Sequence, residues 1–145
     1  MNDIEKSLED AKKQLAKGFT CAFCKDGRAY TAKGKGIKPL LDLVEGEYSL
    51  KNFSAADIIV GKAAAMLFAL AGVCSVYGEV MSESGKAVLE DRGIIYSYGT
   101  LVQKIINRKG DGECPMEMAV KDVAEPEEAL QRIKEKLTEL MNNKA

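Results

Sequence analysis

The stretch SAADIIVGKAAAMLFALAG, residues 54–72, decides the fold class. Ser54 and Asp57 have the spacing of a helix N-cap and an acidic third residue, which predicts that a helix begins here. After Lys62 the run AAAMLFALA is apolar on every side, so this helix is expected in the middle of the domain. The sequence therefore predicts one central buried helix over residues 54–71.

Strand signals lie on both sides of this helix. VCSVYGEVM, from Val73, is apolar enough for a central strand, ESGKAVLEDRG is typical of a helix, and IIYSY is typical of a second strand. A strand, a ten-residue helix and a strand predict a crossover between parallel strands. Upstream, two strand-like runs flank Asp26-Gly27, a strong hairpin turn signal. Together these elements predict an α/β fold with a mixed central sheet.

Further helices are expected toward the two ends of the chain and beside prolines. Lys38-Pro39 opens a short helix through about Glu45, and Cys114-Pro115 opens another. Apolar residues share one helical face near each terminus: Ile4, Leu8, Ala11 and Leu15 at the start, and Leu130, Ile133, Leu137 and Leu140 after Pro126. We expect one domain over residues 1–145, with an N-terminal helix at 1–17 and a core at 18–140.

Composition excludes several classes of protein. The chain has 21 Lys and Arg against 22 Asp and Glu, and this balance predicts no nucleic-acid partner. The basic stretch from Arg28 to Lys38 is interpreted as a solvated hairpin edge. The longest apolar run, Ala63 to Gly72, is about half of what crossing a bilayer requires, so no membrane partner is expected. Without a secretion signal the chain is expected to be cytoplasmic, with its four cysteines reduced.

The predicted helix and strand place a candidate site at one edge of the sheet. A helix over 54–71 would be roughly 27 Å long and would return its N-terminus to the far end of the following strand. Helix N-termini offer unpaired N–H groups and a positive dipole to an anion. The residues expected at this edge are Ser54, Asp57, Lys62, Ser82 and Glu83.

Lys62 is the unusual residue of this group. A lysine in an apolar helix must be desolvated, paired or extended toward solvent. A buried lysine can act as a base, or stay charged and hold a carboxylate or phosphate. The alternative is that Lys62 reaches solvent past Gly61 and has no role. Asp57 could approach Lys62 or could serve only as a cap, and both interpretations stay open.

Three stretches resemble the domain-of-unknown-function family numbered 1893. They are DIIVGKAAAMLFALAGV from Asp57, GIKPLLDL from Gly36 and IINRKGDGECPMEMAV from Ile105, and the resemblance extends from about Gly18 to Leu140. It implies the three-layer α/β/α cytidine deaminase-like fold. Zinc deaminases of that superfamily carry His or Cys two residues before a catalytic Glu on one helix, and Pro-Cys-x-x-Cys on another. Here the corresponding positions read Gly61-Lys62-Ala63 and Ser82-Glu83-Ser84-Gly85, so no metal or other cofactor is predicted.

The cysteines offer weaker candidates. Cys21 and Cys24 have the C-x-x-C spacing of a zinc or redox pair, but positions three apart in a strand face opposite sides. Both are therefore expected to be core residues, as is Cys74. Cys114 differs because it precedes a helix and follows Arg108 and Lys109, which would favour its thiolate. The chain has no histidine to serve as its usual partner base.

Three functional hypotheses follow. The first is binding of a small anionic or nucleotide-like molecule at the predicted edge, with Asn107 and Arg108 contributing from a lid-like loop; the nucleotide part comes only from analogy of fold. The second is a non-zinc enzyme in which Lys62 is the base or nucleophile, oriented by Asp57 or Glu83. The third is a thiol or redox role for Cys114. A homodimer is compatible with all three.

Overall fold

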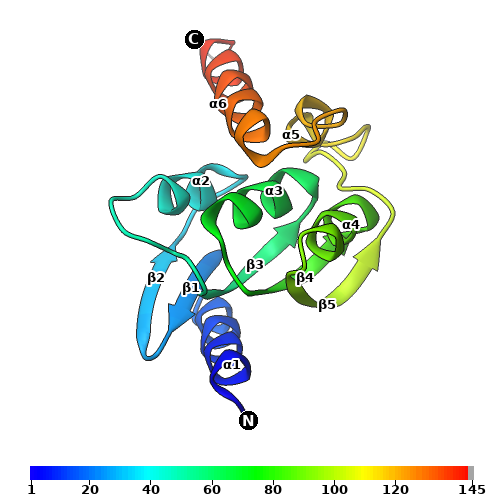
Figure 1. Ribbon diagram of the computed structural model, residues 1–145. Helices are drawn as coiled ribbons and strands as arrows, with labels where there is room; N and C mark the ends of the chain where they lie inside the picture. Colours follow the sequence, from blue (N-terminus) through cyan, green and yellow to red (C-terminus); the bar gives the residue numbers. More distant parts are fainter. Residues whose placement is uncertain (144–145) are drawn as a thin grey trace.

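Within residues 1–143, five strands form a single mixed sheet. The computed structural model describes residues 1–143, so the last two residues of the predicted domain lie outside it. The strands are β1 (Cys21–Lys25), β2 (Arg28–Ala32), β3 (Ser54–Val60), β4 (Ser75–Ser82) and β5 (Ile95–Val102), in the order β2-β1-β3-β4-β5 (Figure 1). β1 is antiparallel to β2 and β3, whereas β3, β4 and β5 are parallel. The predicted α/β fold with a mixed sheet is confirmed.

Helices cover both faces of the sheet and add an outer layer on one side. α1 (Asp3–Ala16) packs on β1 and β3 from one face. The other face carries α2 (Lys38–Val44), α3 (Lys62–Ala71) and α4 (Glu83–Asp91). α6 (Pro126–Asn142) packs on α3 from outside, with α5 (Pro115–Ala119) beside it (Figure 1). α3 is therefore enclosed between the sheet and α6, which explains its apolar character on all sides.

The prediction of a helix over 54–71 is wrong in its first part. Residues 54–60 form the central strand β3, and the helix begins only at Lys62. Three β-branched residues in a row, at 58–60, favour a strand over a helix. A strand covered on both faces is as continuously apolar as a buried helix, so polarity alone cannot separate the two. Ser54 caps no helix: its hydroxyl accepts a 2.7 Å hydrogen bond from the Ser75 hydroxyl.

Other predicted elements are confirmed. The hairpin turns at Asp26 and Gly27, whose φ angles of 49° and 81° are both in the left-handed region. The crossover from β4 through α4 to β5 joins parallel strands, as predicted. Pro39 and Pro126 lie at the first turns of α2 and α6. Among residues 1–143, no helix is long and apolar enough to cross a membrane.

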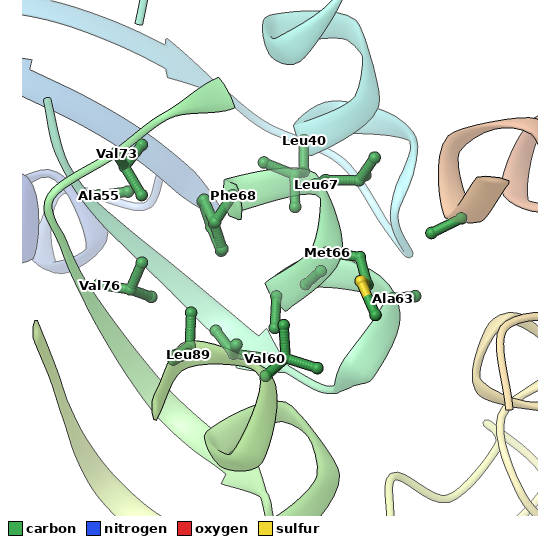
Figure 2. Close-up of a cluster of buried hydrophobic side chains, with 14 of the residues drawn as sticks. Leu40, Ala55, Val60, Ala63, Met66, Leu67, Phe68, Val73, Val76 and Leu89 are labelled. Atoms are coloured by element: carbon green, nitrogen blue, oxygen red, sulfur yellow. The ribbon is translucent and has the colours of Figure 1, made fainter. Parts of the chain in front are cut away.

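The sheet separates two hydrophobic clusters. The larger lies between the sheet and α2–α4, where Phe68 of α3 packs among Val76, Leu89 and Leu40 (Figure 2). The smaller lies under α1 and is made of Ala11, Leu15, Ala22, Cys24 and Ala56. Cys21 belongs to the larger cluster and Cys24 to the smaller, so the prediction that they face opposite sides is confirmed.

Candidate functional site

The N-termini of α3 and α4 meet at one edge of the sheet. α3 follows β3 after Gly61, and α4 follows β4 directly at Ser82. Since β3 and β4 are parallel, both helices begin at the carboxyl edge of the strands. The first turn of α4 lies tightly against the end of β3, because a Cβ at Gly85 would come within 2.7 Å of the Val60 carbonyl oxygen. The geometry thus brings Lys62, Ser82 and Glu83 to the same edge.

The N-terminus of α4 is capped by a side chain of the adjacent residue. Ser82 is the N-cap residue, and its hydroxyl accepts a 3.1 Å hydrogen bond from the backbone N–H of Gly85. The Ser82 side chain is fully buried and also lies 3.1 Å from the Ser84 hydroxyl. This is the ordinary capping arrangement of a serine. It accounts for Ser82 without a ligand.

A carboxylate from a distant helix fills the N-terminus of α3. The Glu117 side chain, on α5, accepts hydrogen bonds of 2.7 Å from the Lys62 N–H and 2.9 Å from the Ala63 N–H. Gly61 makes room for it, because a Cβ there would lie 2.3 Å from Glu117 Oε1. We call this arrangement the Glu117 cap. It places an internal anion where the predicted ligand would bind.

The Glu117 cap is buried and is reinforced by Lys62. Only 7% of Glu117 is exposed, and burial raises its pKa above the ordinary value even though the two N–H donors act in the opposite direction. The Lys62 ammonium donates a 2.8 Å hydrogen bond to the Lys121 carbonyl oxygen, just beyond α5. Lys62 therefore holds the α5 segment from two atoms, and its amine is engaged within the fold.

Sequence reasoning missed the role of Glu117. The signal was present in two parts: a lone glutamate between two methionines in the short PMEMA helix, and an apolar helix preceded by a glycine that has no side chain for capping. The two parts lie more than 50 residues apart along the chain. Only the packing of α5 against α3 connects them.

The structure separates the other predicted residues of the edge. Ser54 begins β3 and pairs with Ser75 at the start of β4, so it lies at the opposite end of the strand from Lys62, and its predicted place at the edge is wrong. Asp57 lies within β3 and pairs in register with Cys21. Within residues 1–143, no hydrogen bond or ion pair joins Lys62 to Asp57 or Glu83.

Asp57 is nevertheless an unusual carboxyl group. Desolvation raises its pKa to about 7, although the backbone N–H groups of Ile59, 3.4 Å from Oδ1, and of Ile58, together with the Cys21 thiol, act in the opposite direction. Burial likewise raises the pKa of the Cys21 thiol, and the neighbouring Asp57 charge acts in the same direction. This pairing disfavours a Cys21 thiolate and makes Asp57 a group that titrates near neutral pH.

The loop before α5 holds the remaining candidates. Asn107 closes a tight turn, donating from Nδ2 to the Asp111 carboxylate over 2.9 Å and accepting from the Asp111 N–H over 3.2 Å. Arg108 lies beside Gly36, in the segment that leads into α2. Cys114 is half-buried, and its N–H donates to the Ile105 carbonyl oxygen over 2.9 Å. Asn107 and Cys114 are thus engaged in contacts of the loop itself.

A hollow of about 330 Å³ lies away from this edge, beside the hairpin tip and the start of β3. We call it the basic hollow. It is lined by Lys25, Arg28, Tyr30, Tyr48, Ser49, Lys51, Asn52 and Phe53. The Tyr30 and Tyr48 rings stack in parallel, with centroids 4.1 Å apart, and the Arg28 guanidinium lies 5.3 Å from the centre of the Phe53 ring. Three cationic side chains and no acidic one line this hollow.

A smaller hollow of about 180 Å³ lies between α1 and the hairpin, where Asp10 stands among Lys13, Lys17 and Arg28. Neither hollow is lined by residues of the Glu117 cap. Among residues 1–143, no three Cys, Asp or Glu side chains come together in a way that could hold a metal ion. Of these two hollows, the basic hollow is the larger candidate for a ligand site.

Comparisons with known proteins report one family. The family model for DUF1893, a domain of unknown function, matches residues 10–137. The chain is also similar to the crystal structure of a DUF1893 family protein from Thermotoga maritima, with a TM-score of 0.82 and 24% identity over 92% of each chain, so the two share a fold.

More distant comparisons add little. The dCMP deaminase from the cyanophage S-TIM5 gives a TM-score of 0.45 and 14% identity over 65% of this chain and 94% of that one. A comparison with curated proteins finds no match. Because the family model extends over most of the sequence, the chain belongs to the DUF1893 family.

Proposed function

We propose that this protein binds a small anionic molecule in the basic hollow. The observation that carries the proposal is the lining: Lys25, Arg28 and Lys51 gather around a cavity with no acidic side chain, in a chain whose net charge is −1. A cluster of cations without counter-ions raises the local concentration of anions. The size of the hollow is within the range of small-molecule sites.

The shape of the lining favours a ligand that has both phosphate and a flat ring. An arginine guanidinium can donate two parallel hydrogen bonds to one phosphate or carboxylate group. The stacked Tyr30 and Tyr48 rings add a flat, half-buried apolar wall beside the cations. A ring placed against such a wall gains stacking as well as burial. These features support a nucleotide-like ligand over a bare inorganic anion.

The carboxyl edge of the strands is a less favourable place for a small anion to bind. A ligand at the N-terminus of α3 would have to displace the Glu117 carboxylate from two hydrogen bonds and free Lys62 from the Lys121 carbonyl. Charge-assisted hydrogen bonds of this kind contribute roughly 1.5–3 kcal/mol each. We therefore move the proposed binding site from Lys62 to Arg28 and its neighbours. Catalysis through Lys62 and reactivity of Cys114 stay predictions.

Isothermal titration with adenosine diphosphate and with inorganic pyrophosphate tests the proposal. Both probes should bind, and the nucleotide should bind more tightly because it also contacts the tyrosine wall. Removing one cation in Arg28→Gln or Lys51→Gln should weaken binding by up to roughly fivefold, at about 1 kcal/mol per exposed charge pair. Each variant leaves the Glu117 cap intact.

Lys62→Gln is the matched control, since it removes one cation at the carboxyl edge instead. It should leave the affinity for both probes unchanged. Weaker binding in Lys62→Gln together with normal binding in Arg28→Gln would return the site to the edge. An absence of binding for both probes would overturn the proposal.

A further inference from the structure

The two edge strands of the sheet differ in length and charge. β2 has five residues, begins with Arg28 and is followed by lysines at 33 and 35. β5 has eight residues, IYSYGTLV, with no charged side chain and no proline. Proteins usually protect exposed edges with short strands, lysine or proline, because open backbone groups invite pairing with another chain. β2 has such protection and β5 does not.

The outer side of β5 presents free pairing groups. No strand within residues 1–143 pairs with this side, and the sheet ends there (Figure 1). The Ile95 N–H donates inward, over 3.1 Å, to the Cys74 carbonyl oxygen. Backbone groups of successive strand residues point to alternate sides, so those of Tyr96 and Tyr98 point outward. Ile95 and Tyr98 also leave 58% and 39% of their surface exposed.

We propose that the outer edge of β5 pairs with β5 of a second copy of this chain, antiparallel and about a twofold axis. The sheet would then continue through both copies. A twofold interface sets a surface against itself, so it needs a strand without like charges. β5 meets that condition, since every one of its eight side chains is uncharged.

Charges beyond the ends of β5 fit the same orientation. Asp91 ends α4 just before the strand, and Lys104 follows it. Antiparallel pairing brings the N-terminal end of β5 in one copy to the C-terminal end of β5 in the other. The region of Asp91 in one copy then faces the region of Lys104 in its partner, so unlike charges come together. Arg92 does not oppose this, because its guanidinium is turned toward the start of α6, where it donates to the Ala124 carbonyl over 2.9 Å and lies 3.4 Å from Glu125.

Sedimentation equilibrium of the full chain, from micromolar to millimolar concentration, tests the proposal. The wild-type chain should form a dimer. Tyr98→Pro removes an outward N–H while leaving the hydrogen bonds to β4, which is the kind of edge position that proline tolerates. It should therefore be folded and monomeric. Tyr98→Thr, the matched control, keeps that N–H and should still form a dimer.

Two further measurements keep the test decisive if Tyr98→Pro disturbs the fold. Thr100→Lys places a charged side chain on the outer edge of β5 in each copy, which is how native sheets prevent edge pairing, and it should also produce a monomer. Amide hydrogen exchange of the wild type should slow with concentration at Tyr96 and Tyr98 but not at Ile95 and Ser97, which face β4. A wild-type monomer at millimolar concentration, a folded Tyr98→Pro dimer, or dimerisation without protection of Tyr96 and Tyr98 would each overturn the proposal.

Discussion

The carboxyl edge of the parallel strands and the basic hollow differ in whether their charged groups already have hydrogen-bond partners within the fold. At the edge, the N–H groups of α3 bond to Glu117 and the Lys62 ammonium bonds to a carbonyl oxygen. In the hollow, Lys25, Arg28 and Lys51 line open space without an acidic neighbour in the lining. A helix N-terminus is thus a site only when the chain does not supply its own anion.

The two helix N-termini at the edge show the same lesson on a smaller scale. α4 is capped by Ser82, the residue directly before it, whereas α3 begins after a glycine and takes its cap from α5. A local cap forms with the helix, but a distant cap requires α5 to be packed in place. The stability of α3 and the position of α5 are therefore coupled through one carboxylate.

The largest expected effect on stability comes from removing the Glu117 cap in Glu117→Ala. The change leaves two buried N–H groups without acceptors, and we expect a loss of roughly 2–4 kcal/mol in the free energy of unfolding. Urea denaturation measures it. Formate, a small carboxylate, should restore part of the loss in this variant and have little effect on the wild type.

The neighbouring Glu113→Ala is the control, since Glu113 makes no bond to α3, and it should change stability by less than about 0.5 kcal/mol. If Glu117→Ala lowered the free energy of unfolding as little as this control, the Glu117 cap would not stabilise the fold. The carboxyl edge and the basic hollow would then not differ in whether the fold itself engages their charged groups.

A smaller effect is expected from Gly61→Ala. The added Cβ would lie 2.3 Å from Glu117 Oε1, so the carboxylate must shift and its two hydrogen bonds weaken. Crowding of this kind costs about 1–3 kcal/mol. In the double variant with Glu117→Ala, the added Cβ has no carboxylate to clash with. The double variant should therefore lose less unfolding free energy than the sum of the two single losses. Strictly additive losses in urea denaturation would show that Gly61 and Glu117 act independently.

The smallest expected effect concerns Asp57, which lies on β3 away from both regions. Its pKa is about 7 in the fold against an ordinary 3.8, so folding favours the protonated form. The stabilisation from this group is complete below about pH 4 and is lost as the pH rises through about 7. Asp57→Asn removes that dependence.

We expect the stability of Asp57→Asn relative to the wild type to be higher above neutral pH than near pH 4, by roughly 1 kcal/mol or more. Urea denaturation at both pH values measures the difference. A constant difference at the two values would mean that Asp57 does not titrate in this range.

Much of the fold could be predicted from local patterns. The hairpin at Asp26-Gly27, the crossover through α4 and the proline-initiated helices each depend on residues close together in the chain. The error over 54–60 arose because a doubly covered strand and a buried helix have the same apolar composition. Residues 54–60 form a strand because they pair with β1 and β4. This pairing between distant segments cannot be recognised from the local sequence.

The sites were harder to predict than the fold. Lys62 stood out because it is charged in an apolar helix, but its partner, the Lys121 carbonyl, comes from a segment placed only by tertiary packing. The basic hollow was overlooked for a related reason: its lining comes from the hairpin and from the segment before β3, and overall charge balance concealed it. Three-dimensional gathering of cations cannot be read from net charge.

Amide chemical shifts of the isotope-labelled protein, recorded as adenosine diphosphate is added, test the central claim most directly. The account predicts shifts at Arg28, Tyr48 and Lys51, while the amides of Lys62 and Ala63, which report on the Glu117 cap, stay in place. Shifts at Lys62 and Ala63 with none in the hollow would contradict it, because the sealed edge would then be the region that opens to a ligand.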